Sequence, residues 1–222
     1  MTMQAERRFT AGNVELRAEG ETGRVIGGHA AVFNKYSANL GGFIEEVDPA
    51  AFNKTLQESD VRCLWNHAPS DLLGRNVAGT LELETDNIGL AYRCQVPDTT
   101  TGRDVVILVG RGDVTQSSFG FRTISDDWYY NAEDFLVRRL LEVQLFDVSP
   151  VTYPAYLDAD STLVRAAYDR LAESRSLKLD EVIAAARAGD LRRLVPAQAG
   201  PPSDTETPDS TTAPSLRHRR LL

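Results

Sequence analysis

Short segments with the residue pattern of β-strands follow one another between residues 24 and 154. The clearest is residues 90–96, in which every second position is an apolar residue, an aromatic residue or a cysteine. This period of two places those side chains on one face of a strand. Residues 80–83 are expected to pair with it as a hairpin through the turn Thr85-Asp86-Asn87. A chain patterned in this way is constrained to a mainly β fold with a few helices.

Other segments complete this α+β prediction. Further strands are predicted at residues 25–33, 61–65, 117–124 and 138–148. The polar residues 125–134 are expected to form a loop between the last two strands. A short helix is predicted to begin at Asp48, with Pro49 in its first turn. A longer helix is predicted at residues 101–112, with Thr101 as its N-cap.

The composition changes near residue 194. Residues 163–194 are rich in Ala, Leu, Arg and Glu with helical spacing, which predicts two helical pieces hinged near residues 174–176. The Pro, Ser and Thr that follow cannot bury enough apolar surface to offset their ordering entropy. The predicted organisation is an N-terminal arm (1–23), a main domain (24–160), a helical extension (161–194) and a disordered tail (195–222).

The charge and the apolar content limit the classes of partner. The formal net charge is −8, which argues against a general nucleic-acid binder because phosphate contacts need clustered positive charge. With 42% hydrophobic and 25% charged residues, the chain has the composition of a soluble globular protein. The longest apolar run, residues 105–109, is far short of the roughly 20 residues that cross a bilayer. Neither a membrane span nor a secretory signal is expected, so the protein is predicted to stay in the cytoplasm.

Only two cysteines occur, Cys63 and Cys94. They are too few for a disulfide scaffold or a Cys-rich zinc site, and both are predicted to be small buried residues in strands. Cys63 and His67 are four residues apart, but on a path from strand to loop this spacing does not bring the two side chains together. The sequence therefore predicts no metal and no cofactor.

Three polar residues could carry chemistry, and each also has an ordinary structural explanation. His67 lies at a strand end, where a general base can face a cleft, although a lone histidine is more often an ordinary surface residue. Ser118 is followed by Gly120, whose missing side chain would let a substrate approach, or it is simply a serine in a strand. Glu142 lies in an apolar strand and invites an imidazole partner, although strand alternation equally fits a solvent-facing position.

Several motifs occur one after another between residues 25 and 156. They are Gly28-His29-Ala30-Ala31-Val32-Phe33, residues 43–52, Asn66-His67, Leu73-Gly74-Arg75, Gly89-Leu90, Ser117-Ser118-Phe119-Gly120-Phe121 and residues 148–155. In combination they resemble the prohead (capsid maturation) serine proteases of tailed bacteriophages. The resemblance implies that residues 24–160 form the protease domain. It also implies a β-barrel-like core surrounded by helices, similar to that of the herpesvirus assembly protease.

The same resemblance implies a catalytic serine and histidine. Ser118 matches the nucleophile and His67 matches the base. The third member is a histidine in the herpesvirus relatives and an acid in the phage family, and here no histidine lies between His67 and His218. Glu142 is the preferred third member and Asp147 is the second choice. The oxyanion donors are left open between backbone N–H groups near Ser118 and the side chains of Arg122, Arg138 and Arg139.

The resemblance also implies a setting for the reaction. The expected substrates are the capsid scaffold or the N-terminal segment of the major capsid protein, cleaved inside the assembling procapsid in the host cytoplasm. Self-cleavage within residues 195–222 and a homodimer are expected as well, whereas nucleic-acid and membrane partners are not. Two alternatives remain: an inactive scaffold or capsid-assembly module of the same fold, and a small-molecule hydrolase. The second is weaker because the chain has no Gly-x-Ser-x-Gly elbow.

Overall fold

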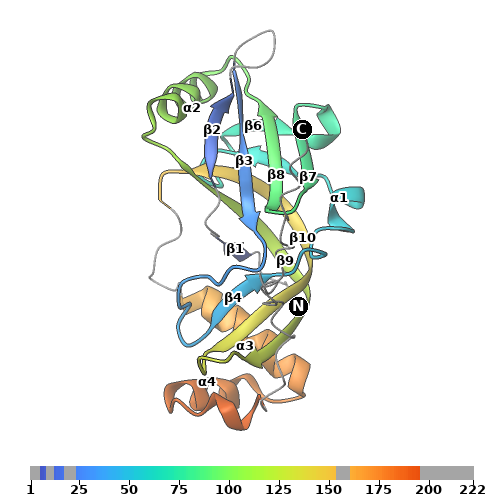
Figure 1. Cartoon of the computed structure of the whole chain (residues 1–222), viewed down its shortest axis with the longest axis vertical. Coiled ribbons are helices and arrows are strands. Elements are labelled where there is room, and N and C mark those ends of the chain that lie inside the picture. The colour runs from blue at the N-terminus through green and yellow to red at the C-terminus, as the bar shows by residue number, and fades with distance from the viewer. Residues whose placement is uncertain (1–5, 9–12, 18–23, 154–160, 196–222) are drawn as a thin grey trace, which may run out of the picture.

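A computed structural model of this chain describes residues 6–8, 13–17, 24–153 and 161–195. These residues form two β-sheets and four α-helices, which confirms a mixed α+β fold. In the described ranges, no helix has the length and apolar character needed to traverse a bilayer. Figure 1 shows an elongated molecule, with the smaller sheet near one end and the C-terminal helices at the other.

The larger sheet is built on one long antiparallel hairpin. Its strand order is β1 (Glu6–Arg8), β9 (Gln116–Tyr130), β10 (Leu136–Val151), β5 (Arg62–Leu64) and β6 (Leu72–Arg75), and β4 (Ile44–Val47) also pairs with β10. Strands β4 and β5 run parallel to β10 and lie at different heights along it. The hairpin of β9 and β10 therefore connects the two ends of the molecule (Figure 1).

The smaller sheet contains the predicted hairpin. Its order is β2 (Val14–Arg17), β3 (Val25–Val32), β8 (Gly89–Gln95) and β7 (Leu81–Thr85), and β7 pairs antiparallel with β8. Buried apolar residues of both sheets form the main core. Within it, the ring of Phe119 on β9 lies 5.6 Å from that of Phe52 and 4.8 Å from that of Phe121, measured between centroids.

Both cysteines lie in this core, as predicted. Cys63 on β5 and Cys94 on β8 are fully buried and carry free thiols. Burial, reinforced by the neighbouring Cys94, raises the pKa of the Cys63 thiol well above its usual range. These thiols therefore contribute to packing as small apolar groups.

Three local predictions differ from the structure. Residues 125–130 continue β9 instead of forming a loop, because Trp128 and Tyr129 are buried and pair across to β10. The helix expected from Asp48 begins later, at α1 (Thr55–Glu58), and is preceded by turns. Helix α2 (Thr100–Arg111) is capped by Thr99, whose side chain accepts a hydrogen bond from the Gly102 N–H at 3.1 Å. In each case the element exists and its boundary is shifted.

The resemblance implied a β-barrel-like core, and the described residues form no closed barrel. Their strands belong to two separate sheets, with β6 at one edge of the larger sheet and β7 at one edge of the smaller. An isolated bridge between Asn13 and Gln116 links the chain just before β2 to the start of β9. The two sheets are thus joined by packing and by shared chain segments, not by a continuous ring of strands.

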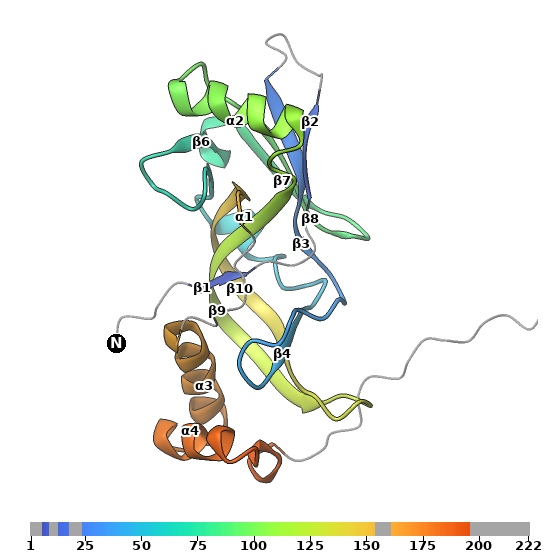
Figure 2. The same ribbon diagram turned by 90° about the vertical axis from the view of Figure 1, so that its left-hand side faces the viewer.

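The C-terminal extension forms the two predicted helical pieces. Helix α3 (Ser161–Arg175) ends one residue before Ser176, which has a φ of 54°, and α4 (Leu179–Arg187) follows before a short 3-10 helix (Leu191–Arg193). Apolar residues of both helices pack with Phe43 and Trp128 in a second core at the far end of the hairpin (Figure 2). The predicted disordered tail lies, apart from Val195, outside the described residues.

Candidate active site

His67 is held at a sharp turn that follows β5. Asn66 and His67 have φ values of 51° and 58°, in the left-handed region that non-glycine residues rarely adopt. Two hydrogen bonds join Asn66 to the end of β10 and the residue after it: its N–H donates to the Pro150 carbonyl at 3.1 Å, and its side-chain oxygen accepts from the Thr152 N–H at 2.9 Å. Surrounding contacts thus fix a strained turn, as is common at functional sites.

This turn places the imidazole of His67 between two polar side chains, one at each ring nitrogen. The Nε2 atom of His67 lies 2.6 Å from the Oγ of Ser118, and its Nδ1 atom lies 2.5 Å from an oxygen of Asp147. Ser118 belongs to β9 and Asp147 to β10, and the register of the hairpin places Ser118 opposite Ser149. Three segments that are distant in the sequence therefore form one hydrogen-bonded chain.

Asp147 receives further support from its own strand and from β9. The hydroxyl of Ser149 donates to the same Asp147 oxygen at 2.8 Å. Gly120 lies opposite Asp147, and a Cβ atom built on it would come within 2.3 Å of the second carboxylate oxygen. The prediction that Gly120 clears the approach of a substrate is thus replaced by a different role, because the space beside it is filled by the Asp147 carboxylate.

The whole arrangement is enclosed. Ser118 and Ser149 have no exposed surface, and His67 and Asp147 are 6% and 9% exposed. Burial strengthens hydrogen bonds between polar groups and penalises any that are left unpaired. The Ser118 hydroxyl is therefore closed to solvent in this structure.

Glu142 does not lie at this site, so its predicted contact with the imidazole is wrong. Its carboxylate pairs with the ammonium group of Lys54 at 3.3 Å and lines a separate open pocket beside α1. Glu142 and Asp147 are an odd number of residues apart, which on a regular strand directs their side chains to opposite faces. The second choice, Asp147, takes the position beside His67, and its place just before Val148-Ser149-Pro150 in the resemblance was the available signal.

The three arginines considered as oxyanion donors have partners elsewhere. Arg122 hydrogen-bonds Gln144, and Arg139 contacts Asp48 at 2.7 Å. Arg138 is buried among carboxylates at the end of β10 remote from Ser149. The backbone N–H groups next to Ser118 remain as candidates. In the parts of the chain that the structure describes, no group of three His, Cys, Asp or Glu side chains is arranged to hold a metal ion.

A serine hydroxyl, an imidazole and a carboxylate in this order of hydrogen bonds have the geometry of a Ser-His-Asp triad. Residues 12–174 match the family described as Caudovirus prohead serine protease. Comparison with the curated proteins and with the solved structures gives no match. The family match covers most of the chain and includes all three polar residues of the site. The chain therefore belongs to the Caudovirus prohead serine protease family, whose members are serine peptidases of procapsid maturation.

Proposed function

We propose that this chain is an endopeptidase in which Ser118 is the nucleophile, His67 the general base and Asp147 the carboxylate that orients the base. The observation that carries the proposal is the continuous chain of hydrogen bonds from the Ser118 hydroxyl through the imidazole to Asp147. Family membership makes peptide hydrolysis the reaction to which this chemistry belongs.

The geometry supports a specific direction of proton transfer. With Asp147 accepting from Nδ1–H, the Nε2 atom carries the free lone pair and accepts the proton of the Ser118 hydroxyl. As the oxygen attacks the peptide carbonyl, His67 takes that proton and then returns it to the departing amine. Asp147 stabilises the imidazolium that forms between these two steps. Water then hydrolyses the acyl-enzyme with the same base.

The substrates that we propose are proteins of the assembling capsid. These are the scaffold or the N-terminal segment of the major capsid protein, cleaved inside the procapsid in the host cytoplasm. The chain's own residues 195–222 are a further substrate, because a Pro-, Ser- and Thr-rich segment can enter a site in extended form. Activation as a homodimer and a core similar to that of the herpesvirus assembly protease stay predictions.

Coexpression with the capsid proteins tests the assignment. Wild-type protein and the matched control Ser70→Ala, which alters an exposed serine, should both shorten the capsid substrate and their own C-terminus, as read by intact mass. Ser118→Ala should leave every chain at full length while it still assembles into particles. If all three proteins behave alike, the serine does not act, and the alternative of an inactive capsid-assembly module holds.

A further inference from the structure

Ser118 is fully buried, and the pairing of its strand β9 differs between the two edges of that strand. On one side, β9 is paired with β10 along almost its whole length. On the other side, its neighbour is β1, whose three residues pair antiparallel with Phe119–Phe121. The β9 residues at this edge follow Ser118 directly. The edge that adjoins Ser118 is therefore occupied by the very short strand β1 on one side and by the bridge between Asn13 and Gln116 on the other.

Of the two strands that flank β9, the shorter one, β1, is the more easily released. Each residue of a ladder adds hydrogen bonds and side-chain contacts, so a three-residue edge strand is held much less strongly than the β9 and β10 hairpin. An extended peptide that adds to a sheet edge uses the same backbone donors and acceptors as a native edge strand. Strand β1 thus uses hydrogen-bonding groups that an extended substrate segment would need beside Ser118.

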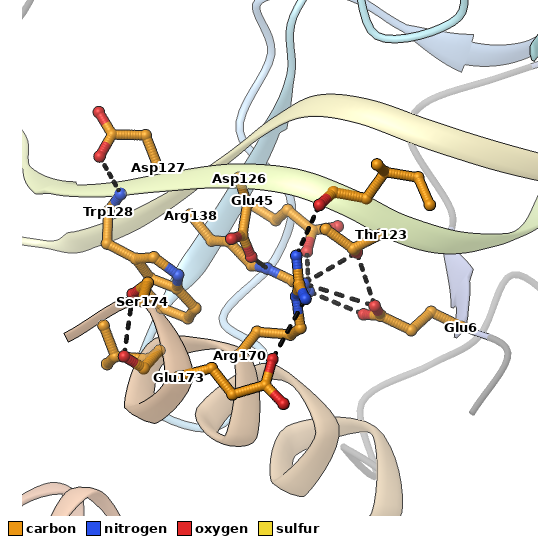
Figure 3. A network of polar contacts seen from close by, with 12 residues as sticks. Glu6, Glu45, Thr123, Asp126, Asp127, Trp128, Arg138, Arg170, Glu173 and Ser174 are labelled. Atoms are coloured by element: carbon orange, nitrogen blue, oxygen red, sulfur yellow. Dashed lines mark hydrogen bonds and ion pairs between the residues drawn. The ribbon is translucent and has the colours of Figure 1, made fainter. Parts of the chain in front are cut away.

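The Glu6 side chain anchors β1 through buried polar contacts. The Glu6 carboxylate is buried, accepts a hydrogen bond from the Thr123 hydroxyl at 2.7 Å and pairs with Arg138 Nη1 at 2.7 Å. Figure 3 shows Glu6 reaching from the N-terminal strand to the guanidinium. Arg138 itself is fully buried, and it also pairs with Glu45 at 3.2 Å and with Asp126 at 2.7 Å.

The charges of this cluster make Glu6 the member that can be released. Three carboxylates surround one guanidinium, so two carboxylates remain beside Arg138 when Glu6 leaves. Glu45 lies on β4, which pairs with four residues of β10, and Asp126 lies within the long strand β9, whereas Glu6 lies on the three-residue strand β1. Release of β1 therefore leaves no unpaired buried cation, which would be the costly outcome.

We propose that β1 is an exchangeable inhibitory strand, and that the edge of β9 at Phe119–Phe121 is where an extended protein substrate pairs once β1 has left. This inference rests on the proposed function of Ser118. It adds that the N-terminal arm regulates access to the nucleophile, and that the Glu6–Arg138 ion pair sets how often the site opens.

The test compares two conservative variants of the full chain that each remove one carboxylate from Arg138. Glu6→Gln weakens the hold on β1, and it should label with a fluorophosphonate and cleave an extended peptide about tenfold faster than wild type. Glu45→Gln removes a carboxylate from the same guanidinium but leaves β1 in place, so it should match wild type within about twofold. Equal rates in the two variants, or a slower Glu6→Gln enzyme, would overturn the proposal.

A second measurement uses the same variants with added peptide. A synthetic peptide of residues 1–12 should inhibit the Glu6→Gln enzyme competitively against the substrate, and a peptide with Glu6 replaced by Gln should inhibit more weakly. Inhibition that is absent or non-competitive would contradict exchange at this edge.

Amide hydrogen exchange separates this inference from the catalytic assignment. In the Ser118→Ala background, Glu6→Gln should speed exchange at residues 6–8 about tenfold, whether or not any variant is a peptidase. Failure of labelling in every protein together with this faster exchange would refute the role of Ser118 but not the mobility of β1. Unchanged exchange would refute the inference itself.

Discussion

The hairpin of β9 and β10 carries two buried polar clusters that are built in different ways. Near one end, Ser118, His67 and Asp147 form a chain of single contacts centred on an imidazole. Nearer the other end, Arg138 lies among three carboxylates, and its guanidinium also lies 5.8 Å from the Trp128 ring centroid. The first cluster is centred on an imidazole, a group that can accept and return a proton, and the second on a guanidinium, which stays charged.

The two clusters therefore differ in the role that we infer for them: catalysis at Ser118 and stabilisation of the fold at Arg138. Burial opposes the charge of Arg138, but the carboxylates of Glu6, Glu45 and Asp126 outweigh it and raise the pKa of the guanidinium above its ordinary value. The Arg138 cluster is therefore fixed in charge, and it connects β1, β4 and β9 to β10. At the Ser118 cluster, the role that we propose for the buried polar groups is to guide one proton along a defined path. Variants of the two clusters should consequently fail in different measurements.

The largest effect is expected at the orienting carboxylate. Asp147→Asn should lower kcat about 10⁴-fold with little change in folding, because the amide no longer holds the imidazole in the required tautomer. Glu142→Gln is the matched control, and its kcat should stay within about twofold because its ion pair with Lys54 is exposed. Steady-state cleavage of a peptide substrate measures both. Equal losses of kcat in the two variants would contradict the assignment of Asp147 over Glu142 as the orienting carboxylate.

At the Arg138 cluster, stability should change instead. Arg138→Met should lower the free energy of unfolding by about 3–5 kcal/mol, because three buried carboxylates lose their cation. Arg139→Met removes the neighbouring and partly exposed arginine, and it should cost no more than about 1 kcal/mol. Urea unfolding measures the difference between the two variants. Similar losses of unfolding free energy would show that the buried Arg138 cluster stabilises the fold no more than an exposed ion pair does.

A smaller loss of activity is expected when a methyl group is added at Gly120, beside the Asp147 carboxylate. In Gly120→Ala the added Cβ would meet the Asp147 carboxylate at 2.3 Å, so the carboxylate must shift. A displacement of this kind should reduce kcat by about 10²-fold. Gly110→Ala places a methyl group near the end of α2, where it would meet the flexible end of the Leu16 side chain at 3.2 Å, and it should keep full activity. Peptide cleavage and a thermal melt of each variant separate a misplaced carboxylate from general unfolding.

The smallest effect is expected at Ser149. Ser149→Ala removes the hydroxyl that donates to Asp147 at 2.8 Å, and kcat should fall about tenfold with KM unchanged. Ser149→Thr keeps the hydroxyl and should recover most of the activity. A lower melting temperature without a change in kcat would show that Ser149 supports only the fold.

The sequence was most informative where a signal is local. Alternation over residues 90–96 predicted β8, and turn residues located its hairpin with β7. It was least informative where tertiary pairing overrides composition. Asp126 and Asp127 read as loop residues, yet they lie in β9, because Arg138 Nε donates a hydrogen bond to the Asp126 carboxylate and Trp128 packs in the second core. Strand β1 was not predicted at all, since three polar residues have no strand signal without their partner.

For the site, the order of the motifs alone determined the family and selected Ser118 and His67. Only the folded structure decided which of Glu142 and Asp147 lies beside His67, because this depends on strand register and on which face a side chain takes in a bulged hairpin. The burial of Ser118, the space that Gly120 leaves for Asp147 and the contact of Glu6 with Arg138 were likewise decided by tertiary structure. All of these join residues distant along the chain, and a local pattern carries no information about such distances.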